Sequence, residues 1–226
     1  MSQQYINLEA TLKHLTTANW ITGLFIVAFL IIAFSKAISG YHFKNFSLLI
    51  ATDKYIKTHK EDTSKKKLHY SLLLFQHTII PFLIQITLYK LNILNEIHFT
   101  EYLKIALSYF VFYLIKYTLE IGFSFLFNAF NSIRNYVFQK KSYQNYISLI
   151  CYPFILLITY QTNFNSSLPV FILIGGYSVF LFIATILAIL NHRKLFFRKY
   201  YVFILYLCTF EIAPYLFSFY LINKTI

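Results

Sequence analysis

The chain of 226 residues is 58% hydrophobic and 21% aromatic, and only 12% of its residues are charged. Charged residues therefore make up about half the share found in an ordinary soluble domain. A soluble fold of this length cannot bury so much apolar surface, whereas a lipid bilayer solvates it. We predict an all-α, polytopic transmembrane helical bundle that forms a single integral membrane domain over residues 1–226.

The formal net charge is +12, from 20 Lys plus Arg against 8 Asp plus Glu. In a soluble protein this excess would indicate nucleic-acid binding, but membrane proteins retain Lys and Arg in their cytoplasmic loops. No module rich in basic and aromatic residues lies outside the hydrophobic segments. We therefore predict the lipid bilayer as the main partner and no nucleic acid.

Six apolar runs predict about six transmembrane helices. Crossing the ~30 Å hydrocarbon core takes ~20 helical residues, and most of the runs reach that length. Uniform apolarity over such lengths favours helices over barrel strands, which alternate over about ten residues. The fourth run is the shortest. The predicted spans are residues 17–38, 68–91, 102–130, 146–160, 168–190 and 200–222.

Basic residues are distributed unequally between the two sides of this arrangement. Fifteen lie in the first, third and fifth loops, whereas four lie on the opposite side and Lys116 lies within a span. Because Lys and Arg accumulate on the cytoplasmic side, we predict both termini outside and a multi-pass protein of the cell inner membrane. The third loop, at residues 131–145, contributes Arg134, Lys140 and Lys141.

The first loop, residues 39–67, is the only long one. Its first part, residues 41–51, mixes aromatic and polar residues and predicts a short helix in the membrane interface. Its second part, residues 53–67, is highly charged and predicts a solvated, mobile segment. The lysines of this loop are either a solvated topology signal or an attraction for anionic lipid headgroups.

The third predicted helix carries a polar face. Eight polar residues recur every three or four positions, which places them on one side of a helix. Lys116 and Glu120 are four residues apart, a spacing that allows an ion pair. Charges at membrane depth usually face the bundle interior, so the face is either a pair that fixes helix packing or a path for a proton, an ion or a polar ligand. The eight are Tyr109, Tyr113, Lys116, Glu120, Ser124, Asn128, Asn131 and Asn135.

The sixth predicted helix has a second polar face, formed by Cys208, Glu211, Tyr215 and Ser218. Glu211 has no basic neighbour within one turn of its own helix, so it needs a partner on another helix, a proton or water. Lys116 is a candidate partner. Pro214 removes a backbone donor and predicts a kink beside Glu211.

In the second predicted helix, His77 aligns with Pro81 and Gln85. A lone histidine is either a packing residue or a group that titrates near neutral pH. Cys151 and Cys208 lie in apolar runs without metal-ligand spacing, which predicts free thiols and no metal site. The sequence contains no H-E-x-x-H, G-x-S-x-G, P-loop or G-x-G-x-x-G motif, so we expect no enzyme, no catalytic residue and no cofactor.

Residues 206–222 read YLCTFEIAPYLFSFYLI. This segment resembles the closing signature of a family of uncharacterised Bacteroidota inner-membrane proteins, a domain of unknown function (DUF4271-like), whose last helix carries a Tyr-Leu-Cys-Thr-Leu-Glu-Ile-x-Pro run. Phe210 replaces the usual Leu, and Trp20 and Lys36 are similar to the family's opening. The resemblance extends over the whole chain and implies a Gram-negative inner membrane and envelope machinery such as type 9 secretion or gliding. The matching residues are Tyr206, Leu207, Cys208, Thr209, Glu211, Ile212 and Pro214.

Small size, little mass outside the membrane and missing catalytic motifs favour a non-enzymatic accessory or scaffold subunit of an envelope complex. Its partners would be other membrane proteins or further copies of the chain. The alternative is a small proton- or ion-coupled transporter that uses Glu211, Lys116, Glu120 and His77. A lipid-modifying enzyme is a third interpretation, which requires a polar pocket open to one leaflet.

Overall fold

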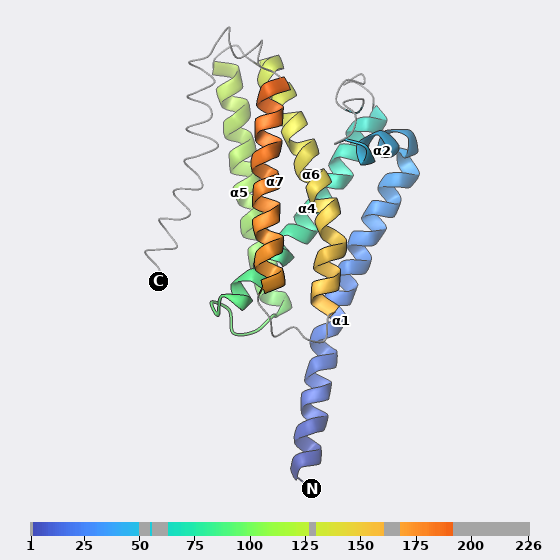
Figure 1. The fold of residues 1–226 in the computed structure, drawn as a ribbon, viewed down its shortest axis with the longest axis vertical. Coiled ribbons are helices and arrows are strands. Elements are labelled where there is room, and N and C mark those ends of the chain that lie inside the picture. Colours follow the sequence, from blue (N-terminus) through green and yellow to red (C-terminus); the bar gives the residue numbers. More distant parts are fainter. Residues whose placement is uncertain (1, 50–54, 56–62, 127–129, 161–167, 192–226) are drawn as a thin grey trace. The chain divides into compact units, whose positions relative to one another are not determined.

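The computed structural model describes residues 2–49, 55, 63–126, 130–160 and 168–191, and every regular element among them is a helix. The predicted all-α class is confirmed for these residues. Two compact units divide the chain: unit 1 comprises residues 1–109 and 142–181, and unit 2 comprises residues 110–141 and 182–226. The helices, shown in Figure 1, are α1 (Ser2–Ile38), α2 (Gly40–Ser47), α4 (Thr63–Lys90), α5 (Phe99–Leu126), α6 (Phe130–Tyr160) and α7 (Leu168–Asn191).

Four of the described helices are long and apolar enough to cross a membrane. They correspond to the first, second, third and fifth predicted spans. The fourth predicted span, residues 146–160, forms the second half of α6, which is not among these four. The sixth, residues 200–222, lies outside the described residues. The four segments are Asn19–Ile38 of α1, Thr63–Lys90 of α4, Phe99–Gly122 of α5 and Leu168–Leu190 of α7.

The prediction of a loop at residues 131–145 is wrong. The segment is the first half of α6, which runs without a break from Phe130 to Tyr160. The segment contains neither Gly nor Pro, so its polar composition does not oppose a helix. Lys140 and Lys141 are buried on this helix rather than solvated in a loop. Even without these two lysines, the basic residues assigned to the cytoplasmic side outnumber those on the other side.

The first loop contains the expected short helix, because α2 lies within or next to the predicted residues 41–51. The prediction of a solvated segment is wrong for Tyr55 and Lys65, which are both 1% exposed. The Tyr55 ring packs edge-on against Phe46, with centroids 5.3 Å apart, and the Lys65 ammonium lies 4.9 Å from the Tyr55 centroid. A cation over an aromatic face is stabilised by the ring quadrupole, which offsets part of the cost of burial.

Helices α1 and α4 pack side by side in opposite directions and form the frame of unit 1 (Figure 1). The Ser35 and Ser71 hydroxyl oxygens lie 2.8 Å apart, and the Ser39 hydroxyl donates to the Ser64 carbonyl at 2.9 Å. Small hydroxyl residues let helix backbones approach closely and bond across the contact, which is how helices associate in lipid. These two bonds fix the register of α1 against α4.

Aromatic rings fill the space beside this contact. Phe82 of α4 is fully buried, and its ring lies edge-on to Phe25 at 5.5 Å and to Trp20 at 6.0 Å. The Tyr152 hydroxyl of α6 donates to the Phe25 carbonyl at 3.0 Å. Trp20 also contacts Phe99, so Trp20 belongs to an aromatic cluster within unit 1. The packing of α1 and α4 therefore depends on Phe82.

We expect Phe82→Ala to destabilise the folded protein by about 2 kcal/mol, because it leaves a cavity between α1 and α4. The loss is smaller than in a soluble core because the unfolded reference state in lipid also keeps the ring in apolar surroundings. Unfolding by titration with a denaturing detergent measures the change. Phe29→Ala, at a 60% exposed position of α1, is the matched control and should have little effect. Equal losses for the two variants would contradict this packing.

Candidate functional site

The polar face of α5 turns inward over its described length. Between residues 107 and 122, only Tyr109, Tyr113, Lys116 and Glu120 are covered, whereas every other residue is exposed. This pattern follows from the helical period, because positions three and four apart lie on one face. The described part of α5 extends to Leu126, and Asn135, which was predicted on the same face, belongs to α6.

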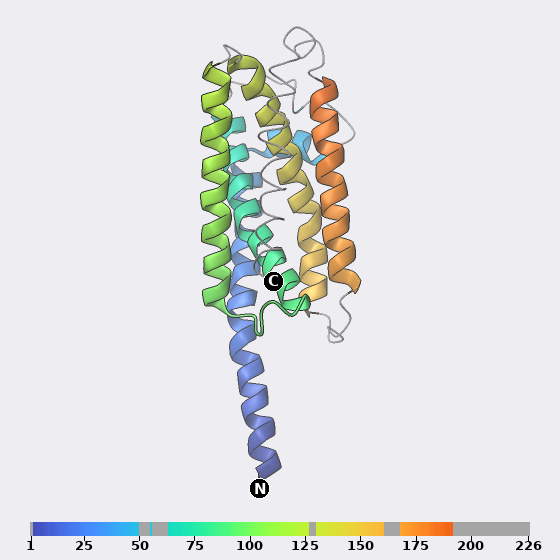
Figure 2. The ribbon, with the colours of Figure 1, turned by 90° about the vertical axis from the view of Figure 1, so that its left-hand side faces the viewer.

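Glu120 forms its ion pair with a residue of the next helix. Lys140 Nζ of α6 lies 3.9 Å from Glu120 Oε1, and both side chains are almost completely buried. Within unit 2, Figure 2 shows α5 ending next to the point where α6 begins. The partner predicted from the sequence spacing, Lys116, is half-buried on the same face of α5.

A second lysine of α6 contacts the same face. Lys141 Nζ lies 4.0 Å from the centroid of the Tyr113 ring, and that ring stacks on Tyr117 with centroids 6.2 Å apart. A desolvated cation–π contact of this kind contributes up to about 2 kcal/mol. We call Tyr113, Lys116, Glu120, Lys140 and Lys141 the charged cluster. All five residues belong to unit 2.

The charged cluster is rich in positive charge. It contains three lysines and one carboxylate, and the Lys140 ammonium lies nearest to that carboxylate, so an additional carboxylate close to Lys116 or Lys141 would be stabilised. Glu211, the residue that needs a cross-helix partner, lies outside the described residues, as do Cys208 and Asn128. Convergence of Glu211 with Lys116 therefore stays a prediction.

The contact between Glu120 and Lys140 is a contact of charges rather than a hydrogen bond. Its 3.9 Å separation exceeds the 2.7–2.9 Å typical of charge-assisted bonds. Neither carboxylate oxygen of Glu120 has a hydrogen-bond partner among the described residues. In a low dielectric, a buried acceptor without a hydrogen bond is costly.

His77 lies in unit 1 and takes part in packing between α4 and α5. Its Nδ1 is 2.8 Å from the Leu73 carbonyl of its own helix, and its ring centroid is 5.1 Å from that of Tyr109. Nearby, Gln76 Nε2 donates to the Tyr109 hydroxyl at 3.3 Å, and Gln85 Nε2 donates to the His98 carbonyl at 2.9 Å. These bonds favour a packing role for His77 and Gln85.

The sequence pattern did not predict the burial of the Tyr55 side chain, which packs against Phe46 of α2 in unit 1. Burial raises the pKa of the Tyr55 phenol well above its ordinary value, and a side-chain hydrogen bond with Ser142 offsets part of the rise. The Tyr146 hydroxyl donates to the Ser47 carbonyl at 3.2 Å, which joins α6 to α2. The Tyr55 phenol therefore stays neutral. Because Tyr55 contacts both Lys65 of α4 and Ser142 of α6, it connects these two helices.

Metal chemistry finds no support in the part of the chain that the structure describes. Cys151 is a buried free thiol, as predicted. No group of three or more His, Cys, Asp or Glu side chains is arranged there to hold a metal ion.

We expect Glu120→Gln and Lys140→Met each to destabilise the protein by about 3 kcal/mol, because each change leaves one buried charge without its partner. The double variant should lose clearly less than the sum of the two. A double-mutant cycle, measured by denaturing-detergent titration, gives the coupling energy.

The matched control is the exposed pair of Lys104 and Glu101, whose atoms are only 2.7 Å apart. Solvent screening should hold the effect of Glu101→Gln below about 1 kcal/mol. Strict additivity at Glu120 and Lys140 would show that the two charges do not interact.

Comparisons with known proteins place the chain in a family. No curated protein and no solved structure matches it. The sequence does match the family described as Domain of unknown function (DUF4271) over residues 21–222, which includes the four segments long and apolar enough to cross a membrane, apart from Asn19 and Trp20. With most of its length covered by that match, the chain belongs to the DUF4271 family.

Proposed function

We propose that this protein is a non-enzymatic accessory or scaffold subunit of an envelope complex in the cell inner membrane. The proposal rests on the contacts that the charged side chains of unit 2 make between helices. Glu120 of α5 faces Lys140 of α6, and Lys141 of α6 covers Tyr113 of α5. Charges committed to contacts between helices stabilise one arrangement of α5 and α6, which is what a scaffold requires.

A place for a partner helix lies on α7. Gly175 and Gly176 are exposed in an apolar segment, and an added Cβ at either would meet no atom of the described residues within 4 Å. Glycine weakens a helix by about 1 kcal/mol relative to alanine, and no close approach by another described residue requires it at these positions. Small residues are favoured where transmembrane helices of different chains meet. The pair therefore supports docking of a helix from another membrane protein or from a second copy.

The family resemblance of residues 206–222 directs the proposal to the envelope of Bacteroidota, in machinery such as secretion or gliding. The topology that we propose has six spans with both termini outside and the first and fifth predicted loops in the cytoplasm. The excess of Lys and Arg on one side supports it.

This topology predicts opposite labelling of two exposed positions. In a Cys151→Ser, Cys208→Ser background, Asn95→Cys should react with a membrane-impermeant maleimide in intact spheroplasts. Lys44→Cys on α2 should react only after the membrane is broken. Because both side chains are exposed, a difference between them reports sidedness. Labelling in the reverse order would invert the topology.

For the scaffold itself, we expect purification in a mild detergent to recover stoichiometric membrane-protein partners or a defined oligomer. Gly175→Leu together with Gly176→Leu should reduce that recovery roughly tenfold or more, because bulky side chains prevent close helix approach. Val179→Leu, at a 59% exposed position on the same helix, is the matched control and should leave recovery unchanged. A solitary monomer from the wild-type chain would contradict the proposal.

The second candidate is a proton- or ion-coupled transporter that uses Glu120, Lys116 and Glu211. It is favoured by the Glu120 carboxylate oxygens, which are buried without a hydrogen-bond partner among the described residues. The same purified protein discriminates the two functions after reconstitution into proteoliposomes. A carrier shows gradient-driven proton or ion flux that Glu120→Gln abolishes while the protein stays folded, whereas a scaffold shows no flux in either form.

A further inference from the structure

We propose that α1 forms a parallel, in-register coiled coil with the same helix of a second copy of this chain. The contact surface is a stripe of mainly apolar positions that runs along α1 on the side opposite to α4. It is a different surface from the glycine pair of α7, so the inference does not depend on the scaffold or transporter function.

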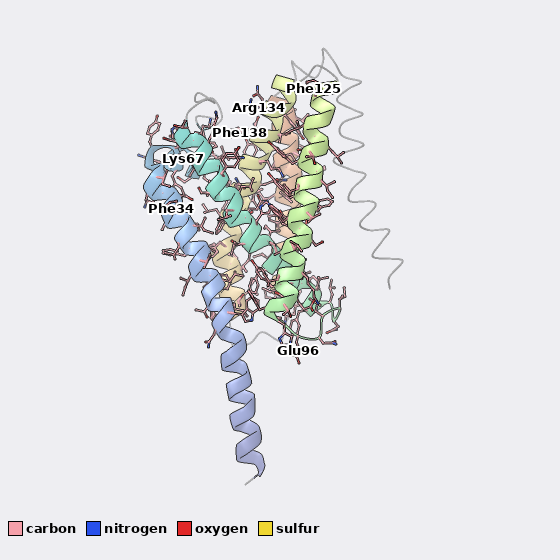
Figure 3. The ribbon with its side chains drawn as sticks, turned by 180° about the vertical axis from the view of Figure 1, so that it is seen from behind. Phe34, Lys67, Glu96, Phe125, Arg134 and Phe138 are labelled. Carbon is pink, nitrogen blue, oxygen red and sulfur yellow. The ribbon has the colours of Figure 1, made fainter. Side chains whose placement is uncertain are left out.

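Helix α1 is much longer than its membrane-crossing segment. It runs without a break from Ser2 to Ile38, whereas the segment long and apolar enough to cross a membrane begins only at Asn19. Residues 2–18 therefore add ~26 Å of helix. Figure 3 shows α1 continuing past the level of Glu96, with Phe34 toward its opposite end. Because α1 is continuous, this part projects from the membrane, and a single helix of this length is only marginally stable in water.

The sequence of the projecting part has the heptad pattern of a coiled coil. Tyr5, Leu8, Leu12 and Leu15 are spaced three, four and three residues apart, as alternating a and d positions require. Ile6 is the one large apolar residue off this line between residues 2 and 18, where the others are polar or alanine. The spacing therefore favours a second helix with the same repeat as the partner of this part of α1.

The same line of positions continues through the membrane segment. At 100° per residue, all of these positions fall within an arc of about 80°. Phe25, Ala28 and Ser35, which are buried in the contact of α1 with α4, lie on the opposite side of the helix. The face along the stripe is thus open to a partner. Its positions in the membrane segment, which are all exposed, are Asn19, Gly23, Ile26, Leu30, Ala33 and Ala37.

A second copy of the chain matches this stripe in direction, height and charge. All copies of a membrane protein enter the bilayer in the same orientation, so two α1 helices are parallel and in register. The positions beside the seam then pair Gln4 with Glu9 and Thr11 with Thr16, and no like charges meet. Asn19 occupies an a position, where a single polar residue pairs with its own copy and specifies the register.

The length of the stripe is sufficient for a stable contact. From residue 5 to residue 37 it extends over ~48 Å, and a helix contact ~10 Å wide covers about 500 Å² on each copy. The total of about 1,000 Å² reaches the lower limit for a specific interface. Gly23, Ala33 and Ala37 contribute within the membrane, because small residues let two helix backbones approach closely.

Cysteine crosslinking of the full-length protein in native membranes tests the pairing. In a Cys151→Ser, Cys208→Ser background, Leu8→Cys and Leu12→Cys should each give a disulfide-linked product when oxidised with copper phenanthroline. When two differently tagged copies are expressed together, the product should carry both tags. Such a product identifies the partner as a second copy rather than another protein.

Two kinds of control define the face and the direction. Ala10→Cys and His14→Cys, on the other side of the helix at similar levels, should crosslink at least tenfold less. A mixture of copies carrying Leu8→Cys and Leu15→Cys should also crosslink poorly, because these levels are ~10 Å apart in a parallel pair.

Charges in the seam should separate the two copies. Leu8→Asp with Leu12→Asp should lower the dimer fraction of the purified protein roughly tenfold or more, because it places like charges across the contact. Ala10→Asp with His14→Asp has the same spacing on the other side and should leave the dimer unchanged. Unchanged detergent-unfolding curves show that both variants are folded.

The crosslink at Leu8→Cys should persist when Gly175→Leu and Gly176→Leu remove the α7 surface, which separates this result from the scaffold function. The proposal is overturned if the stripe positions and their controls crosslink alike, or if the staggered mixture crosslinks as well as the matched copies. A crosslinked product that contains a different protein in place of the second copy would also overturn it.

Discussion

The fold depends on one constraint, which is that a polar group at membrane depth finds its partner inside the protein. Lipid offers no hydrogen bond, so an unpartnered charge or amide there is costly. Glu120 meets Lys140 between α5 and α6, the Gln76 amide donates to Tyr109 of α5, and the Gln85 amide donates to the His98 carbonyl just before α5, which meets this constraint in part. Inside a membrane protein, polar residues therefore mark the contacts between helices, and apolar residues mark the surface.

The same constraint explains why the sequence is informative about α5 and misleading about α6. On α5 the polar residues are sparse and recur with the helical period, so their spacing alone identifies the face that they share. In residues 130–145 polar residues occupy nearly every position, and composition alone does not distinguish a solvated loop from a helix buried by its neighbours. Local spacing indicates Lys116 as a possible partner for Glu120, whereas only tertiary packing brings Lys140 of α6 near it.

Lys65, which is buried at the start of α4, shows a similar limit of prediction from sequence. Three successive lysines, residues 65–67, look alike in the sequence, yet Lys65 is 1% exposed and its two neighbours are exposed. Lys65 continues the buried line of Leu68, Leu72 and Phe75, at spacings of three and four. The predicted span began at residue 68, which left Lys65 in the loop. Extending the helical period by one turn would have identified it.

The helical register of α4 thereby divides its first lysines into two classes with different uses. Lys65 faces inward and meets the Tyr55 ring, where it joins the end of the helix to the rest of unit 1. Lys67 is two positions further on, which turns it by more than half a circle to the exposed side of the helix. A positive charge on this helix is therefore structural or available to a ligand according to its face. Net charge and loop counts cannot make that distinction.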